Sequence, residues 1–287
     1  MNVEVRVPAT VANLGPGFDC LGVAVGMHLQ ARIDLSPAPE VAGEGPLRPP
    51  ERNLTYRSFL AAHEACGRQA PPIRIEVLRS YASARGMGAS ASAIVAGLVA
   101  ARELSELDLP DPDLARLAIE IEGHADNVLP ALFGGLVLAS RNSWMHLDPT
   151  PAISPVIIVS PHKMKTGEAR GVLPREVPRS DAVANAAALS ALVAVLGGLE
   201  PPEGLLPATE DRLHQPYRLP LMAESARLLG ALRAEGIAAA LAGSGPSIVC
   251  LAAADAAEDC ARLAGRLAPE GWEVLIPGWD LAGAQVR

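Results

Sequence analysis

The sequence predicts a protein of mixed helices and strands that is divided into two domains near residue 150. Its 287 residues exceed the usual size of a single domain, which indicates one large domain or two modest ones. Segments with strand-like alternation and segments with helical periodicity occur together in both halves of the chain. The proline-containing stretch "LDPTPAISP" is the best candidate for a linker, so we expect domains at 1–150 and 151–287.

The first half opens with the strand "VEVRVPAT", which alternates apolar and polar residues and is expected to end at Pro8. A turn-forming stretch, "ATVANLGPGFDCLG", leads into the apolar segment "LGVAVGMHLQARIDL". After a loop rich in proline and glycine, the apolar spacing predicts a helix over residues 53–67 and a second strand over 73–81.

Three further elements complete the first half. The segment "SASAIVAGLVAARELSEL" predicts a helix whose first turn includes Ser90. "PDPDLARLAIEIEG" begins with aspartates suited to a helix N-terminus and predicts another helix. The apolar stretch "ALFGGLVLAS" predicts a short strand that contains a glycine pair.

The second half reads as a small sandwich of helices and strands. It begins with the strand "PVIIVSP", followed by the helix "DAVANAAALSALVAVLGGL", which is so continuously apolar that we expect it to be largely buried. A helix around "LMAESARLLGALRAEG" precedes two strands, "IAAALA" and "IVCLAA", which flank the turn "GSGPS". A helix through Leu267 and the strand "WEVLIPG" end the pattern.

Composition excludes several classes of function. The net charge of -8 disfavours binding to nucleic acid, which needs a basic surface, and the sequence has no such stripe. No apolar stretch is long enough to predict a membrane span, and the N-terminus "MNVEVRVPAT" does not have the pattern of a signal peptide. We therefore expect a cytoplasmic protein that binds neither membranes nor nucleic acid.

The cysteines and lysines are also informative. The four cysteines do not have metal-ligand spacing and are interpreted as small buried side chains in a reducing compartment: Cys20, Cys66, Cys250 and Cys260. Lys163 and Lys165 are the only lysines, so arginine supplies nearly all of the positive charge. That scarcity matters because many phosphate-binding sites use a lysine.

The stretch "ARGMGASASAIVAG" lies between a predicted strand and a predicted helix, which is a suitable place for binding phosphate. Glycines let backbone N–H groups approach an anion, and the free donors at a helix N-terminus favour negative charge. The Ser90 hydroxyl would lie in the first helical turn, where it could contact a phosphate oxygen or Mg²⁺.

The glycine pattern alone leaves more than one interpretation open. A Walker A loop is excluded because no lysine is nearby. A dinucleotide fingerprint fits the spacing of Gly86, Gly88 and Ala91, but that fold requires a strand directly after the helix, where this sequence predicts a second helix. A tight strand-to-helix turn without any ligand also fits.

The stretch resembles the phosphate loop of the GHMP kinases, whose pattern is P-x-x-x-G-L-G-S-S-A-A. Gly86, Gly88, Ser90 and Ala91 match that pattern. The sequence departs from it at four positions, namely Ala82, Met87, Ala89 and Ser92.

Further segments resemble the homoserine kinase branch of this family, in order along nearly the whole chain. They are "VPATVANLGPGFDCLG", "EGHADNVLPALFGG", "KTGEARGVLP", "HQPYR" and "LAGSGPSIVCL". The resemblance implies a two-domain α+β GHMP kinase fold. Its N-terminal domain is like domain 2 of ribosomal protein S5, and its C-terminal domain is a ferredoxin-like sandwich.

The resemblance also implies the activity. A member of this branch transfers the γ-phosphoryl group of ATP to the hydroxyl of L-homoserine, giving O-phospho-L-homoserine and ADP on the route to threonine. ATP would be the co-substrate and Mg²⁺ the cofactor, and a homodimer is expected from the family.

The nucleotide-binding residues follow from the matched loop, and Ser90 and Glu122 would share one Mg²⁺. Asn53 would lie against the adenine, although a helix N-cap is its ordinary explanation. The residues expected to bind ATP are Asn53, Ala84, Arg85, Gly86, Met87, Gly88, Ala89, Ser90, Ala91 and Ser92.

The acceptor would be held by charged and polar side chains. Arg170 and Arg218 match the carboxylate-binding positions, a task that suits the two-pronged donor geometry of arginine. The ammonium and neighbouring atoms are assigned to Asp19 and Asn13, and His124 belongs to the substrate-binding set.

We assign the catalytic positions to Glu122, Asp126 and Asn127 and predict no strong general base. The substrate hydroxyl would attack directly while Asn127 and its neighbours hold it near the γ-phosphate. Two alternatives remain open: the same scaffold acting on another alcohol such as mevalonate, and a sensor that has lost catalysis. Ala82 and Ala89 in the loop are the only residues that favour the sensor.

Overall fold

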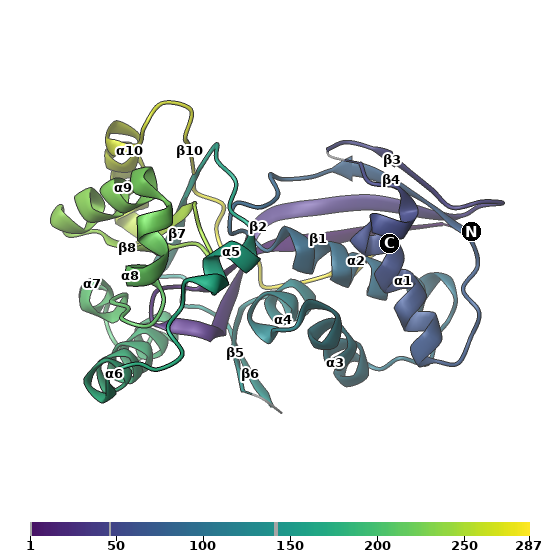
Figure 1. Cartoon of the computed structure of the whole chain (residues 1–287), viewed down its shortest axis with the longest axis horizontal. Coiled ribbons are helices and arrows are strands. Elements are labelled where there is room, and N and C mark those ends of the chain that lie inside the picture. The colour runs from purple at the N-terminus through teal and green to yellow at the C-terminus, as the bar shows by residue number, and fades with distance from the viewer. Residues whose placement is uncertain (1, 46, 141–142) are drawn as a thin grey trace.

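The computed structural model describes residues 2–45, 47–140 and 143–287, which form two β-sheets covered by helices (Figure 1). In this part of the chain seven strands make up the first sheet, in the order β11-β1-β2-β4-β3 with β5 and β6 joined through β2. The strands are β1 (Asn2–Asn13), β2 (Gly17–Leu35), β3 (Glu40–Gly43), β4 (Ile73–Arg79), β5 (Leu136–Ala139), β6 (Trp144–Leu147) and β11 (Gln285–Val286).

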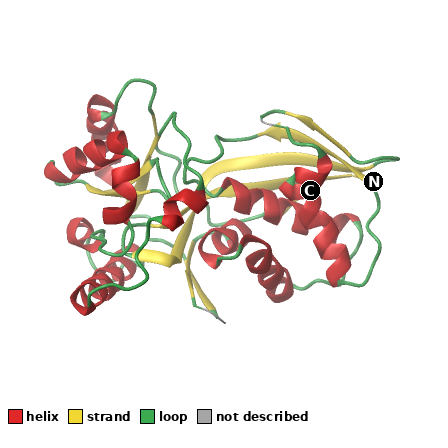
Figure 2. Ribbon diagram, viewed as in Figure 1, coloured by secondary structure: helices red, strands yellow, loops and turns green. Residues whose placement is uncertain are grey.

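The long hairpin of β1 and β2 organises the first half, because β1 pairs with β2 over nearly its whole length. Four helices cover one face of this sheet (Figure 2). They are α1 (Leu54–Ala65), α2 (Ala89–Leu104), α3 (Asp111–Glu122) and α4 (Ala125–Phe133). The apolar side chains of β1, β2 and β4 form one core with those of the helices, in which Ile33, Phe59 and Leu98 are fully buried.

The second half is a four-stranded antiparallel sheet in the order β10-β7-β9-β8. The strands are β7 (Ile153–Val159), β8 (Ala238–Leu241), β9 (Ile248–Ala253) and β10 (Glu273–Leu275). One face packs against α9 (Ala223–Ala234) and α10 (Ala257–Leu267). The other face shares a core with α6 (Arg179–Leu196), α7 (Leu205–Ala208) and the turn end of the β1–β2 hairpin. The short helices α5 (Thr166–Gly171) and α8 (Gln215–Arg218) complete this half.

This arrangement confirms the predicted α+β fold and refines several of its elements. The sheets separate between β6 and β7, where the linker was expected, but the chain end returns to the first sheet as β11. The first strand does not end at Pro8, and the pairing of β1 with β2 instead shifts register between Pro8 and Ala9. A proline is tolerated at such a bulge because the ladder is interrupted there.

Helix α4 was not predicted, and the strand predicted over "ALFGGLVLAS" begins too early, because residues 131–133 end this helix and only Leu136–Ala139 form β5. The helix is short and includes Pro130, which is unfavourable in a helix interior. Without an N–H, Pro130 cannot bond to the carbonyl of Asp126 in the preceding turn. That carbonyl approaches β2 so closely that a Cβ on Gly22 would lie 1.6 Å from its oxygen. Because residue 22 is a glycine, the first turn of α4 can pack directly against β2, and this contact positions Asp126 and Asn127.

The prediction that residues 181–199 form a largely buried helix is wrong in its burial. Helix α6 buries only Asn185, Leu192, Val195 and Leu196, and Val183 is 63% exposed. By length and composition α6 is apolar enough to cross a membrane, although a single helix of this kind also occurs in proteins that do not. An apolar composition shows that a helix can be buried, but how much of its surface is buried depends on which elements pack against it in the fold.

Candidate active site

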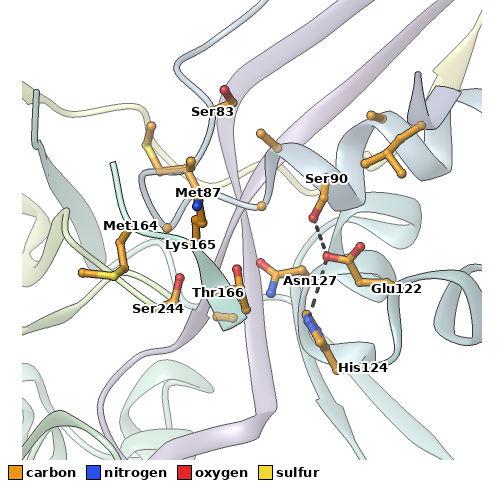
Figure 3. A pocket seen from close by; sticks show the side chains of 18 of the residues that line it. Ser83, Met87, Ser90, Glu122, His124, Asn127, Met164, Lys165, Thr166 and Ser244 are labelled. Carbon is orange, nitrogen blue, oxygen red and sulfur yellow. Dashed lines mark hydrogen bonds and ion pairs between the residues drawn. The ribbon is translucent and has the colours of Figure 1, made fainter. Parts of the chain in front are cut away.

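A single pocket of about 470 Å³ gathers most of the residues singled out in the sequence. Its walls come from both halves of the molecule: the glycine-rich loop, the β1–β2 turn and the α3–α4 junction on one side, and residues 164–170 and the 243–244 turn on the other. Figure 3 shows Ser90, Glu122, His124 and Asn127 gathered at one wall, with Thr166 and Ser244 facing them from the second half.

The glycine-rich loop is held in a conformation that favours glycine. Gly86 and Gly88 have φ of +83° and +64°, in the left-handed region. A Cβ on Gly86 would lie 1.9 Å from the carbonyl oxygen of Ala242, and one on Gly88 would lie 1.9 Å from Oγ1 of Thr10. The loop therefore packs closely between β1 and the turn after β8. Gly88 is the N-cap residue of α2.

The N-terminus of α2 offers free backbone donors and a hydroxyl to the pocket. The helix runs for 16 residues, so its dipole favours an anion at this end. The Ser90 hydroxyl donates to Oε1 of Glu122 at 2.5 Å. Burial raises the pKa of Glu122, and the hydrogen bond from Ser90 opposes that shift. A cation here would relieve the cost of keeping this carboxylate ionised.

His124 connects this carboxylate with the next one along the chain. Its Nδ1 lies 2.7 Å from Oδ1 of Asp126, and its Nε2 lies 3.9 Å from Oε1 of Glu122. The hydrogen bond with Asp126 raises the pKa of His124, and burial opposes that shift. The Asp126 carboxylate, only 2% exposed, is therefore occupied in holding the imidazole.

Two neighbours fix the amide of Asn127. The buried Thr10 hydroxyl donates to its Oδ1 at 2.8 Å, and its Nδ2 donates to Oδ1 of Asp126 at 3.3 Å. Exchanging the amide oxygen and nitrogen would bring the oxygen against a carboxylate, which is unfavourable. Asn127 lines the pocket, and its Nδ2 has a second N–H that the bond to Asp126 does not use.

At the end of the pocket where the acceptor is expected (the acceptor end), Arg170 was predicted to bind a carboxylate and Asp19 an ammonium group. In this structure these two side chains instead pair with each other. Arg170 donates to both carboxylate oxygens of Asp19, at 2.8 and 2.7 Å, across 151 residues of sequence. Each side chain is about one-third exposed. The hydrogen bond with Asp19 raises the pKa of Arg170, and burial opposes that shift.

Arg218 differs from Arg170 because it is only 2% exposed and its partners are uncharged. Nε donates to the carbonyl of Ala169 at 3.2 Å, and the guanidinium lies 5.1 Å from the centre of the Phe18 ring. Burial lowers the pKa of Arg218, and Arg170 lowers it further, yet arginine remains charged in proteins. A buried cation beside a pocket favours an anionic ligand.

Most of the predicted residues line this pocket, with three exceptions. Ala91 and Ser92 are fully buried, and the backbone N–H of Ser92 donates to the carbonyl of Gly88 inside α2. The Ser92 hydroxyl bonds to the carbonyl of Pro8, away from the pocket. Arg85 points to the carbonyl of Pro161. The backbone N–H of Ser92 is therefore used within the helix, and Arg85, Ala91 and Ser92 do not line the pocket.

Two predicted ligands have structural partners as well as a place in the pocket wall. The side chain of Asn53 caps α1 by accepting from the N–H of Tyr56 at 3.1 Å. Nδ2 of Asn13 donates to the carbonyl of Gly243 at 2.8 Å, and its Oδ1 accepts from the N–H of Asp19 at 3.1 Å. Asn13 therefore ties the β1–β2 turn, and Asp19 with it, to the second half.

Sequence reasoning missed several lining residues. Lys165, Thr166 and Ser244 belong to motifs already recognised in the sequence, which was the signal available for them. Arg48 and Arg52 lie in a loop whose sequence gave no such signal. Thr10 does not line the pocket and is recognised only through its bond to Asn127.

Comparison with known proteins places this site in a family. The N-terminal family model of the GHMP kinases matches residues 53–135, and the C-terminal model matches residues 185–267. The chain therefore belongs to the GHMP kinases, which confirms the resemblance found in the sequence.

Relatives that are 36–43% identical to this chain over most of its length are homoserine kinases, and the chain belongs with them. A homoserine kinase of Streptomyces avermitilis is 43% identical, over 99% of this chain and 95% of that protein. One of Leifsonia xyli is 39% identical, over 99% and 92%. The crystal structure of a homoserine kinase from Cytophaga hutchinsonii superposes with a TM-score of 0.89 at 29% identity, covering 100% of this chain and 97% of that one.

Proposed function

We propose that this protein is an ATP- and Mg²⁺-dependent homoserine kinase of threonine biosynthesis, which converts L-homoserine and ATP into O-phospho-L-homoserine and ADP. One observation carries the proposal: a single pocket has a phosphate-binding helix N-terminus at one end and two arginines with an aspartate at the other. Those groups match a polyphosphate and a zwitterionic amino acid. The relatives named homoserine kinase support the same assignment.

The donor set fits Mg²⁺, which prefers oxygen ligands and keeps several waters and phosphate oxygens around it. The Ser90 hydroxyl and the Glu122 carboxylate, already in contact, would hold the ion. Among the described residues no group of three or more His, Cys, Asp or Glu forms a closed metal site. When bound, the metal would neutralise charge on the ATP phosphates.

The charges at the acceptor end complement an amino acid. Its carboxylate pairs with Arg218 and Arg170, and its ammonium pairs with Asp19. The Asp19–Arg170 ion pair then has to open or shift so that the zwitterion can bind between its two members. In the complex Asp19 would pair with the substrate ammonium and Arg170 with the substrate carboxylate, so neither side chain would be left without an opposite charge.

Asn127 and Asp126 support direct attack without a general base. The Asn127 amide offers N–H, so it can hold the oxygen of the substrate hydroxyl or of the γ-phosphate but cannot remove a proton. The hydroxyl oxygen forms the new bond to γ-phosphorus, the bond to the β–γ bridging oxygen breaks, and the hydroxyl proton passes to a phosphoryl oxygen. If Asp126→Asn abolished turnover while both substrate affinities stayed intact, a base mechanism would replace this one.

The direct test is ADP release by the purified protein with a panel of alcohols: homoserine, mevalonate, galactose and shikimate. We expect turnover with homoserine that depends on added Mg²⁺. Turnover with mevalonate in place of homoserine would assign the scaffold to another alcohol. Binding of ATP and homoserine without ADP release would instead indicate a sensor.

We also propose a cytoplasmic homodimer with domains at 1–150 and 151–287, the second of which returns its last strand, β11, to the sheet of the first. The outward face of α6 supports a second copy as its cover, because Ala182, Val183, Ala186 and Ala187 are exposed there without any charge. A face that packs on itself about a two-fold axis is the commonest route to a dimer. Light scattering of the wild type and of Val183→Glu tests this: we expect a dimer and a monomer respectively, and a monomeric wild type would refute it.

A further inference from the structure

One buried titratable side chain beside the pocket has no part in the mechanism so far. His214 is fully buried at the start of α8 and stacks on Phe18, with ring centroids 5.3 Å apart. Its Nε2 lies 2.8 Å from the carbonyl oxygen of Gly15, and its Nδ1 lies 3.2 Å from Nη1 of Arg218. The imidazole therefore bridges the β1–β2 turn and an arginine of the acceptor end.

These two contacts determine the protonation state of the ring. The carbonyl of Gly15 can only accept, so Nε2 carries the proton and donates to it. The guanidinium of Arg218 can only donate, so Nδ1 is unprotonated and accepts from Nη1. A protonated ring would present N–H to a guanidinium and lose this bond.

The charged groups around the ring favour that neutral form. Burial lowers the pKa of His214, the charge of Arg218 lowers it further, and Asp211 at 3.5 Å opposes them. Asp211 is itself occupied, because its carboxylate accepts from the backbone N–H groups of Leu213, His214 and Gln215. Asp19 is the remaining acidic group that acts on the ring.

The contacts of Arg218 show what the histidine contributes. Nε is bonded to the carbonyl of Ala169, and Nη1 is shared between His214 and the carbonyl of Gly243 at 3.3 Å. Within the described residues Nη2 makes no hydrogen bond, and the side chain lines the pocket. Two nitrogens of the guanidinium are therefore anchored, which leaves the third for a ligand.

We propose that His214 is a positioning residue for substrate recognition: its neutral Nδ1 anchors Arg218 so that Nη2 faces the carboxylate of the amino-acid substrate. This inference rests on the proposed homoserine kinase activity and adds a residue that acts through Arg218 without touching the substrate. Because His214 holds the Arg218 guanidinium in its binding orientation before the substrate binds, the arginine side chain loses less conformational entropy on binding.

Two nearly isosteric variants separate the two hydrogen bonds of the ring. His214→Asn places an amide oxygen where Nδ1 was, so it keeps the acceptor for Arg218 and loses the bond to Gly15. His214→Gln places an amide N–H where Nε2 was, so it keeps the bond to Gly15 and loses the acceptor. Thermal unfolding of both variants establishes that each is folded.

We expect His214→Gln to raise KM for homoserine about tenfold, as for the loss of one hydrogen bond to a charged group. KM for ATP and kcat should change little, and His214→Asn should stay within about threefold of the wild type. 3-Aminopropan-1-ol, which has the hydroxyl and ammonium without the carboxylate, should compete with homoserine equally well in wild type and His214→Gln. In an Arg218→Ala background His214→Gln should add no further loss.

Three results would each refute positioning and indicate a structural role. They are an equal rise in KM for homoserine in His214→Gln and His214→Asn, weaker competition by 3-aminopropan-1-ol to the same extent in His214→Gln, and an additional rise in KM when His214→Gln is combined with Arg218→Ala. An unchanged KM for homoserine in His214→Gln would also refute it. If the wild type released no ADP with homoserine, the proposed function would fail first, so the two failures are distinguishable.

Discussion

The two ends of the pocket are built in different ways. The end proposed to bind the nucleotide is built mainly from one stretch of chain, residues 83–93, in which backbone groups and glycine conformations shape the wall, and Glu122 and Asn53 add side chains from other segments. The end proposed to bind the acceptor is assembled from side chains of separate segments: Asp19 from the start of β2, Arg170 from α5 and Arg218 from α8. Asn13 bonds the end of β1 to the turn after β8, and His214 bonds the start of α8 to the β1–β2 turn.

This difference indicates what each end can tolerate. A backbone site accepts side-chain changes that keep the loop conformation, which is consistent with Ala89 standing where the family pattern has serine. A side-chain site depends on each charge and on what holds it in place. Substitutions should therefore affect the nucleotide end mainly through its metal ligands, and the acceptor end through any of its ion pairs and anchors.

The largest expected effect is at the nucleotide end. Glu122→Gln removes the negative charge that would hold Mg²⁺ while keeping the shape and a partner for Ser90, so kcat should fall on the order of 10³-fold. Glu120→Gln, on the exposed side of the same helix, is the matched control and should behave as wild type. A fall of less than tenfold in Glu122→Gln would mean that the metal is held elsewhere.

The next effect concerns the acceptor end. Arg218→Ala removes a buried cation that is proposed to pair with the substrate carboxylate, so KM for homoserine should rise about 100-fold while KM for ATP is unchanged. Steady-state kinetics with each substrate varied in turn measures the two constants. Arg212→Ala, which alters a half-exposed arginine, is the control. Equal changes in both constants would show that the two ends are not separable.

A smaller effect is expected where the two ends meet. Thr10→Val keeps the side-chain shape but leaves Oδ1 of Asn127 without its donor, so the amide can rotate and kcat should fall about tenfold. Thr10→Ser keeps the hydroxyl and should retain most of the activity. If valine and serine gave the same kcat, the orientation of the Asn127 amide would not matter to the reaction.

The smallest effect is a pH dependence of stability at the α3–α4 junction. The pKa of His124 is raised above its usual 6.5 in the folded state, chiefly by the hydrogen bond with Asp126. Its protonated form therefore stabilises the fold below that pH, and the contribution is lost as pH rises through the raised pKa. The difference in unfolding free energy between wild type and His124→Gln should shrink by roughly 1 kcal/mol or less from pH 6 to pH 9.

Urea denaturation of both proteins across that range measures the difference. A difference that stays constant with pH would mean that the pKa of His124 is the same in the folded and unfolded protein, so that the hydrogen bond with Asp126 does not favour the protonated ring.

Much of the fold followed from local patterns, and its errors have identifiable causes. Strand β4 and helices α1, α2 and α3 lie where the sequence pattern placed them: α1 and α3 bury one face, and α2 is an apolar segment buried on all sides over much of its length. Helix α4 was missed because Pro130 is unfavourable in a helix interior, and the glycine at position 22 that accommodates it lies far away in sequence. The burial of α6 was overestimated because the sequence does not say which elements cover a helix.

The sequence by itself determined the glycine-rich loop and the helix that follows it, since left-handed φ values and free helix-end donors arise from neighbouring residues. It also carried the motifs that identify the family. Only the tertiary structure decided that Asp19 pairs with Arg170, that Thr10 orients Asn127, and that His214 anchors Arg218. Those contacts join residues more than 100 positions apart or depend on burial by distant segments, and burial is what converts a surface charge into one that requires a partner.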